Sequence, residues 1–507
     1  MGHRIWFVAR HDSNQGTGQA MNAVRSLVGA WLVLDFFGES RRSRSPGSTL
    51  TTTIFTQSFL ALVLAALLFP ETPPTAFAAA ALCFSTLLDS VAGLGETATT
   101  ARARADAVLL HTSPVAAWQR VAARCLHGSF RLVLCTVGMA LPPGILLAML
   151  TGDAWAVARH LVAACACSAL AGAAFTVVVQ VAARLRGPDA AALLSGTLRA
   201  LALGVGLMAF ALGIRHLDEG IGAMPFPAWV VENLPMLWAA RAVVAPAANL
   251  DAVVLLAATG MALLLLLRLV GDAESARGRR RSSKGLADRL EALLAADPVT
   301  RGLANFTGVM LWRNPGFRSR ALPLFGVPAA MVLLGLRGAT DAERELFLAV
   351  ALQFPAVYLP FLVALLPRGE QPEAAWVFAQ GPDTTLARAR QAAHIALCVR
   401  VLLPLHALAL AAMLVGGVDP WFALPLSLTS LGTAAVLARF QARALQHVPF
   451  TQPTEGAAPT EMGSLLLGAL VLLGFACAWV LALPPAVRWI FALQLPATAV
   501  LQLRARA

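Results

Sequence analysis

The sequence predicts an all-α integral membrane protein with about twelve transmembrane helices, arranged as two six-helix repeats. Three observations support this: the composition, a series of apolar segments of membrane-spanning length, and a polar stretch that occurs twice. The chain of 507 residues is 58% hydrophobic and 13% charged, and its mean hydropathy is +0.70. Soluble proteins are about half apolar and about a quarter charged, whereas an apolar run of about 20 residues crosses a hydrocarbon core of about 30 Å. A lipid bilayer is therefore the expected solvent.

Residues 1–50 are expected to form a cytoplasmic tail and an interfacial helix. The first twenty residues are polar, so no cleavable signal peptide is expected and the first span itself directs membrane insertion. The segment from Met21 to Phe37 is apolar at helical spacing, but Arg25 and Asp35 interrupt it and it is slightly short for a span. These features favour a helix that lies along the inner interface.

Residues 51–270 are expected to form the first membrane half, with six spans. Pro70 ends the first span, and the loop that follows carries no positive charge. Between residues 215 and 250, several prolines interrupt a segment that contains Trp229 and Trp238, which favours broken helices at the outer membrane face. The expected spans are residues 52–69, 76–94, 130–150, 157–183, 196–214 and 251–270.

Residues 271–320 are expected to form a basic cytoplasmic linker with an interfacial helix, and residues 321–507 the second six-span half. The linker contains the basic run RGRRRSSK at residues 277–284 and a short amphipathic helix, LADRLEALL, from Leu286 to Leu294. The segment from Asn305 to Phe317 then leads into the next span. The expected spans of this half are residues 321–337, 345–366, 393–416, 421–440, 463–482 and 486–503.

The charge distribution predicts the orientation. The formal net charge is +12, and the loops that alternate with the expected outer loops hold nearly all of the arginines. Cytoplasmic loops of membrane proteins are enriched in Lys and Arg, so both termini, the linker and both long polar stretches are expected in the cytoplasm. A nucleic-acid partner is not expected, because the arginines are scattered over many short loops. The seven cysteines contain no CxxC pair, which favours buried free thiols over metal ligands or disulfides.

The repeated polar stretch lies between spans two and three of each half. The first copy runs from Glu96 to Arg124, and the second, from Glu370 to His394, follows about 268 residues later. When Pro114 is set against Pro382, Arg120 coincides with Arg388. An element that recurs at a long, fixed spacing indicates two copies of one membrane unit.

Familiar catalytic and nucleotide-binding motifs are absent from the sequence. The only lysine is Lys284, so the lysine of a phosphate-binding loop has no counterpart, and no metal-binding His or Cys pattern occurs. Charged residues near the spans either extend toward the interface or line a transport path; Arg131 and Arg400 take matching places in the repeat. The residues considered are Asp89, Arg131, Arg159 and Arg400 among the charged groups, and His111, His127, His394 and His406 as isolated packing or loop histidines.

The sequence ADAVLLHTSPVAAWQRVAAR, from residue 105 to residue 124, resembles the cytoplasmic segment of ABC-type exporter permeases of the six-span exporter class. In that family an acidic residue precedes an LLxSPV-like turn, and a helix with Arg and small residues then enters span three. The second copy, EAAWVFAQGPD, is more divergent, and Gly381 stands where the family has Ser. The matching residues are Asp106, Leu109, Leu110, Ser113, Pro114, Val115 and Arg120 in the first copy, and Glu373, Trp376, Val377, Pro382 and Arg388 in the second.

The resemblance implies a permease subunit that moves an unknown substrate across a bacterial inner membrane when a separate ATPase drives it. The two stretches would act as cytoplasmic coupling helices and receive two copies of the ATPase. Val108, Leu109, Leu110 and Trp118 would be apolar anchors in a groove of that partner, with Asp106 and Arg120 at the rim. The chain would be a transporter subunit rather than an enzyme. It would contact membrane lipid and would bind no cofactor itself, because ATP would bind to the partner subunit.

Three alternatives remain open at this stage. A twelve-span secondary transporter of the major facilitator type also has six plus six spans, inner termini and a long central loop, but its short loop between spans two and three, rich in Gly and in Asp and Arg, has no counterpart here. An intramembrane enzyme would need paired acid and base groups within a span, and none is apparent. Finally, the two polar stretches could simply cap the bundle. The apolar pathway walls favour a lipid-like or amphipathic cargo.

Overall fold

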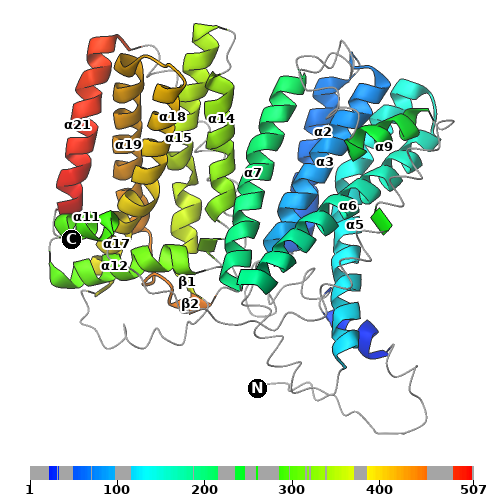
Figure 1. Cartoon of the computed structure of the whole chain (residues 1–507), viewed down its shortest axis with the longest axis horizontal. Helices are drawn as coiled ribbons and strands as arrows, with labels where there is room; N and C mark the ends of the chain where they lie inside the picture. Colours follow the sequence, from blue (N-terminus) through cyan, green and yellow to red (C-terminus); the bar gives the residue numbers. More distant parts are fainter. Residues whose placement is uncertain are drawn as a thin grey trace.

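The chain forms a bundle of long helices, shown in a computed structural model (Figure 1). Most helices run roughly parallel to one another, and two short helices lie across one end of the bundle. We call this end, where α11 and α12 lie, the linker end. The structure describes residues 22–30, 32, 49–69, 71–97, 116–186, 188–214, 234–245, 259–260, 285–295, 297–314, 317–318, 321–336, 340–369, 385–453 and 483–504.

The helices of the first half are connected up and down. They are α2 (Thr49–Leu68), α3 (Pro74–Thr97), α5 (Ala117–Thr151), α6 (Trp155–Arg186), α7 (Pro188–Ile214) and the short α9 (Pro235–Val244). The side chain of Gln119 accepts a hydrogen bond from the backbone N–H of Ala116, at 2.9 Å, and so supports the start of α5. Gly152, with φ of 69°, ends α5, because this left-handed conformation suits glycine.

The second half begins with the two helices across the linker end, α11 (Leu286–Leu294) and α12 (Pro298–Arg313). The bundle helices follow: the short turn η2 (Leu322–Phe325) with α14 (Gly326–Leu336), α15 (Asp341–Leu365), a continuous helix made of α17 (Thr385–Leu397), η4 (Cys398–Leu402) and α18 (Leu403–Val415), then α19 (Pro420–Arg443) and α21 (Pro485–Arg504). Strands β1 (Arg368–Gly369) and β2 (Gln452–Pro453) pair in parallel at the linker end.

Ten of the twelve expected spans coincide with described helices, and the amphipathic helix expected from Leu286 to Leu294 occurs with the same bounds. The expected spans 251–270 and 463–482 lie outside the described residues, apart from residues 259–260. Within the described chain, six helices are long and apolar enough to cross a membrane. They are Pro74–Val91, Leu126–Thr151, Trp155–Arg186, Arg344–Leu365, Leu386–Val415 and Pro420–Arg443.

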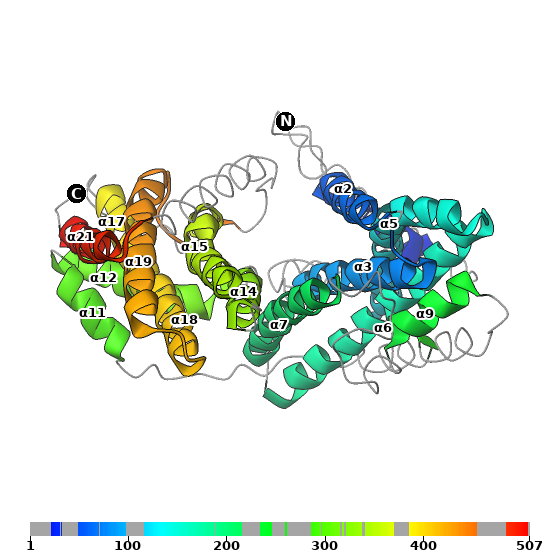
Figure 2. The ribbon, with the colours of Figure 1, turned by 90° about the horizontal axis from the view of Figure 1, so that it is seen from above.

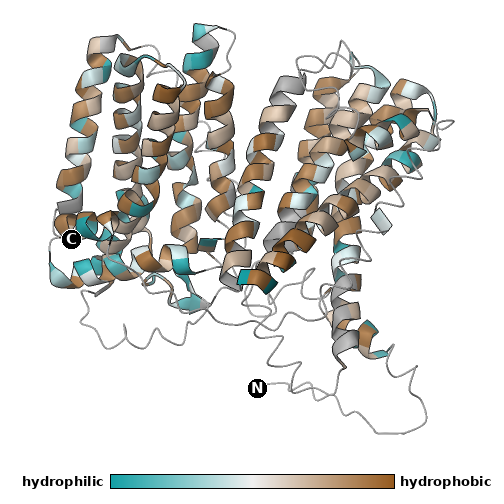
Figure 3. Cartoon of the chain, in the orientation of Figure 1, coloured by the Kyte–Doolittle hydropathy of each residue, from teal (hydrophilic) through white to brown (hydrophobic). Residues whose placement is uncertain are grey.

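The helices of the bundle consist mostly of apolar residues (Figure 3), and many of the large apolar side chains are exposed. Phe55 and Leu67 on α2 are 73% and 76% exposed, and Leu408 on α18 is 70% exposed. Large apolar side chains also face outward on α5, α7, α19 and α21. Soluble monomers rarely present contiguous apolar patches of this extent, so this surface fits contact with lipid.

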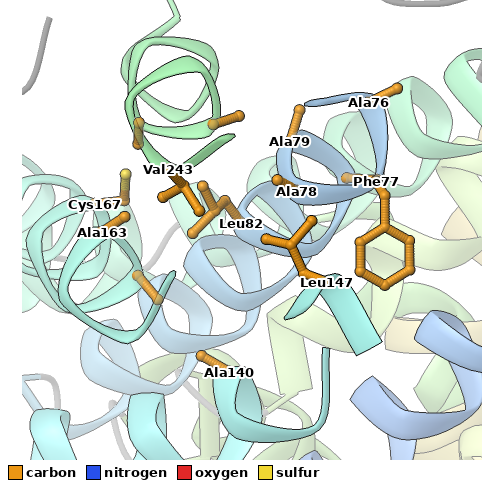
Figure 4. Packing of buried hydrophobic residues seen from close by; sticks show 14 of the residues in the cluster. Ala76, Phe77, Ala78, Ala79, Leu82, Ala140, Leu147, Ala163, Cys167 and Val243 are labelled. Atoms are coloured by element: carbon orange, nitrogen blue, oxygen red, sulfur yellow. The ribbon is translucent and has the colours of Figure 1, made fainter. Parts of the chain in front are cut away.

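The core of the first half is built largely from alanines (Figure 4). Along α3, alanines flank Phe77 and Leu82, which pack against α5, α6 and α9. Small residues let helix backbones approach closely, which is how membrane helices associate when lipid surrounds them. The labelled core residues are Ala76, Phe77, Ala78, Ala79, Leu82, Ala140, Leu147, Ala163, Cys167 and Val243.

The two halves meet along α7 and α14, as the view from above shows (Figure 2). A Cβ added to Gly204 would lie 2.8 Å from the carbonyl oxygen of Gly326, and one added to Gly326 would collide with the backbone of Ala200. Gly196, Ala200 and Gly204 follow one another at four-residue spacing on α7, the small-residue pattern typical of tightly packed membrane helices. We call these residues together with Gly326 the glycine seam.

Candidate functional site at the linker end

Most of the predicted partner-binding residues lie outside the described chain. In the first stretch these are Asp106, Leu109, Leu110, Ser113 and Pro114, and in the second they are Glu373, Trp376 and Pro382. Trp118 and Arg120 belong to the first turn of α5, and Arg388 belongs to the first turn of α17. The site described below therefore consists of the elements around the two ends of the second stretch, where β1 precedes it and α17 follows it.

Its centre is an ion-pair cluster beneath the second half. The guanidinium of Arg400 donates from Nε to Glu291 Oε1 at 2.7 Å and from Nη2 to Glu291 Oε2 at 2.9 Å, and Nη2 also lies 2.5 Å from Asp288 Oδ1. Glu291 is only 1% exposed. Arg400 was expected either to extend toward the interface or to line a path; instead it binds the linker helix. We call Asp288, Glu291 and Arg400 the linker clamp.

The sequence of α11 explains how both carboxylates reach Arg400. Asp288 and Glu291 are three residues apart, so they lie on the same face of the helix. Asp288 also accepts a hydrogen bond from the backbone N–H of Gly285 through Oδ2, at 2.8 Å. One carboxylate thus both supports the start of α11 and binds Arg400, so the formation of this helix and its docking depend on the same side chain.

Arg400 lies in a π-helical segment, η4, which proline chemistry accounts for. Pro404 has no backbone N–H to give to the carbonyl of Arg400, and the N–H of Leu403 bonds to the carbonyl of Cys398, five residues back. Single π-turns within α-helices occur frequently at functional sites. Here the π-turn places Arg400 opposite α11.

Gly308 on α12 makes room for the clamp. A Cβ at this position would lie 2.7 Å from Arg400 Nε and would also collide with Glu291 Oε1. A Cβ on Gly302, six residues earlier on the same helix, would meet nothing within 4 Å. The glycine at 308 therefore lets α12 lie directly against the ion pair.

The start of α12 contacts a predicted site residue, Arg388. The carboxylate of Asp297 accepts hydrogen bonds from the backbone N–H groups of Val299 and Thr300, both at 3.0 Å, and from the Thr300 hydroxyl at 2.7 Å. These hydrogen bonds, that of the Thr300 side chain foremost, lower the pKa of Asp297 below its ordinary value. Arg388 Nε approaches Asp297 Oδ1 to 3.9 Å, a partly exposed pair of small energetic weight.

The segment that follows α15 and the segment that follows α19 are hydrogen-bonded to each other at the linker end. Phe450 donates its backbone N–H to Leu366 O, and Gln452 donates to Pro367 O, both at 2.7 Å. Asn314, at the end of α12, donates through Nδ2 to Arg368 O at 3.3 Å. The residues immediately before position 370 are therefore fixed to both α12 and β2, so the second polar stretch starts from a rigid base.

The other charged residues noted in the sequence serve different roles. Asp89 is buried and accepts hydrogen bonds from Thr136 and Ser168. Arg159 pairs with Asp153 at 2.6 Å and donates to Val243 O, at the end opposite the linker. His394 contacts Ala435 O, and His406 contacts Leu402 O and Ser430, so both pack between helices.

Sequence reasoning missed the partners of Arg400. Asp288 and Glu291 lie 112 and 109 residues away in the chain, and on their own helix they read as the polar face of an amphipathic segment. One signal was available: Glu291 is flanked by Leu290 and Ala292 in LADRLEALL, and an acidic residue near an apolar face often has a basic partner.

The described residues contain no group of three or more His, Cys, Asp or Glu side chains that could hold a metal ion. The chemistry of the linker clamp is that of a buried salt bridge, which holds elements together rather than transforming a substrate. No protein-family model, curated protein or solved structure matches the chain.

Proposed function

We propose that the chain is the membrane-spanning permease of an ATP-binding-cassette exporter of the bacterial inner membrane, with both six-helix halves in one polypeptide. In this proposal two cytoplasmic ATPase subunits bind the two polar stretches, and their closure moves one half against the other to alternate access. The chain itself performs no ATP hydrolysis.

The observation that carries the proposal is the recurrence of helix boundaries. The first residues of α3 and α15, Pro74 and Asp341, are 267 residues apart, and those of α6 and α19, Trp155 and Pro420, are 265 residues apart. These spacings are close to the 268 residues between the two polar stretches. A nearly constant spacing of this kind supports two copies of one unit.

The two polar stretches lie at equivalent positions in the two halves. The first stretch lies between α3 and α5 in the chain, and the second lies between α15 and α17. Arg131 and Arg400 are 269 residues apart rather than 268, and the wider π-turn at η4 accounts for the one-residue difference. Matching positions for both stretches favour a pair of identical functions, as a two-subunit ATPase requires.

The distribution of charge supports a cytoplasmic linker end. Arg184 and Arg186 close α6, Arg313 closes α12 and Arg443 closes α19, all at this end. At the opposite end, Arg159 is paired with Asp153, and Arg344 donates to Gly416 O at 3.0 Å. An excess of arginine at one end is the pattern that sets membrane orientation.

The first helix after the first stretch reaches well beyond the bilayer. α5 has 35 residues, about 52 Å at 1.5 Å per residue, against a hydrocarbon core of about 30 Å. Its apolar part begins at Leu126, and the preceding turns extend below the bundle (Figure 1). Such an extension offers a rigid lever between a soluble partner and the membrane.

Purification of the full-length chain from its native membranes tests the proposal. We expect a protein with a phosphate-binding lysine loop to co-purify, and Leu110→Asp to remove at least one of its two copies while the chain stays folded. Leu286→Asp, at an exposed site on α11, is the matched control and should retain the partner. Recovery of a monodisperse chain without any ATPase, together with substrate uptake driven by an ion gradient alone, would instead establish a secondary transporter.

A further inference from the structure

A buried carboxylate lies inside the first half, where three helices meet. Asp89 on α3 is 6% exposed. Thr136 on α5 donates its hydroxyl to Asp89 Oδ2 at 2.6 Å, and Ser168 on α6 donates to the same oxygen at 2.7 Å. An ionisable group at this depth is costly in a membrane and is by default a functional candidate.

The two oxygens of this carboxyl group differ in their surroundings. Oδ2 accepts both hydroxyl hydrogen bonds, whereas Oδ1 makes none within the described chain. A protonated carboxyl group has one accepting oxygen and one that carries the proton. The arrangement therefore leaves Oδ1 available for a proton without disturbing either hydroxyl.

A hydroxyl on the same face of α3 also lacks a hydrogen-bond partner within the described chain. Thr86 lies three residues before Asp89 and so shares its face of α3. Its Oγ1 is buried and has no partner within the described chain. Buried hydroxyls are normally hydrogen-bonded, so Thr86 Oγ1 is a second unsatisfied oxygen on the face of α3 that carries Asp89.

No cation compensates a charge on Asp89, which forms no ion pair within the described chain. Cys165 on α6 is the titratable group in electrostatic contact with it. An ionised carboxylate without a counter-ion is strongly unfavourable away from water. The other titratable or charged groups of the helices packed on α3 are Arg120, Arg124, Cys125, His127, Arg131 and Cys135 on α5, Arg159, His160, Cys167, Arg184 and Arg186 on α6, Asp189 and Arg199 on α7, and Arg241 on α9, with Cys83 and Glu96 on α3 itself.

We propose that Asp89 is a proton-binding site of the membrane domain, with the proton on Oδ1 in the state described here. Uptake converts the carboxylate and one proton from water into a neutral carboxyl group, and release reverses this step. Asp89 lies eight residues before the end of α3 at Thr97, about 12 Å along the helix, so exchange occurs from the linker end. A separation of α5 or α6 from α3 would remove a hydroxyl donor and admit water, which links the protonation state to helix movement.

Infrared difference spectroscopy of the full-length protein in lipid nanodiscs tests this site. We expect a carbonyl band of a neutral carboxylic acid at neutral pH that shifts in heavy water and disappears in Asp89→Asn. Because the amide oxygen can still accept from Thr136 and Ser168, Asp89→Asn should fold with an unchanged melting temperature. Glu71→Gln, at an exposed acid in the loop before α3, should leave the band intact.

A second variant reports on the geometry. Ser168→Ala removes one donor to Oδ2, so the carbonyl band of Asp89 should move to higher frequency without losing intensity. If Asp89→Asn removes carboxylate bands rather than a neutral-acid band at neutral pH, Asp89 is ionised and the proposal is wrong. The proposal does not depend on the ATPase: the band is measured on the chain alone, so its absence would leave the proposed exporter function untouched.

Discussion

The guanidinium of Arg400 is held by two carboxylates from a helix more than a hundred residues earlier in the chain. A buried salt bridge gains little over well-packed apolar residues, but removal of one partner leaves an uncompensated buried charge. The linker clamp therefore adds little net stability. Its effect is to fix the position of α11 against η4.

Removal of Arg400 should consequently be severe. We expect Arg400→Met to destabilise the protein by about 3–5 kcal/mol, because Glu291 then remains buried without a counter-ion. Unfolding in mixed detergent micelles measures this loss of stability.

Arg388→Met, which removes a partly exposed pair, is the control and should cost less than about 1 kcal/mol. The double variant Arg400→Met with Glu291→Met should recover part of the loss; equal losses for Arg400→Met and Arg388→Met would contradict the clamp.

The two glycines of α12 give a matched pair of substitutions. Gly308→Ala should destabilise the protein, because the new methyl group overlaps both the Glu291 carboxylate and the Arg400 guanidinium. Gly302→Ala meets nothing within 4 Å and should stabilise the helix by about 0.5–1 kcal/mol. Thermal unfolding of the two variants should therefore shift in opposite directions, and shifts of the same sign would show that α12 does not touch the ion pair.

At the level of the helices, the start of α12 depends on the ionisation of Asp297. Its folded-state pKa is lowered, so the stabilisation is complete above the unfolded pKa of about 3.9 and is lost as the pH falls through the lower folded value. We expect Asp297→Ala to cost about 1 kcal/mol at neutral pH. Asp297→Asn keeps a capping oxygen, so it should keep most of the stability that the cap contributes. Because the amide does not titrate, the variant should not lose this stability below about pH 4. Denaturation curves recorded across this pH range would measure both effects.

The sequence predicted the helices far better than their contacts. Apolar runs bounded by Pro, Gly and Asp locate α3, α6 and α19 because lipid requires long, internally hydrogen-bonded segments. The start of α12 was not predicted, although Asp297 followed by Pro298 is a sequence signal that could have located it. Arg400 and Glu291 could not be paired in this way, because their meeting depends on how the linker folds back across the second half. The π-turn at η4 likewise depends on the local cost of Pro404 within a long helix.

At the level of the whole molecule, the described helices of the two halves meet at α7 and α14, and the glycine seam lies in this contact. At Gly204 and Gly326 the backbones of the two helices touch directly. A seam of small residues is therefore suited to a fixed axis about which two halves rock.

Widening this seam should loosen the halves. With a protease site inserted at residues 277–284, the cut halves should remain together on size-exclusion chromatography. Gly204→Ile should let them separate, because the added Cβ lies 2.8 Å from Gly326 O. Gly172→Ala on α6, whose Cβ would make an ordinary contact of 3.8 Å with Leu132, is the control and should not separate them. Halves of the Gly204→Ile protein that stay together would place their main contact elsewhere.

The stoichiometry of the complex tests the proposed function most directly. Native mass spectrometry of the chain, purified with its partner from its own membranes, should give one 53.1 kDa polypeptide with two ATPase subunits, one for each polar stretch. Leu110→Asp should reduce this to a single ATPase subunit or to none. A chain that is recovered alone, or as a complex in which no subunit binds ATP, would contradict the proposed exporter.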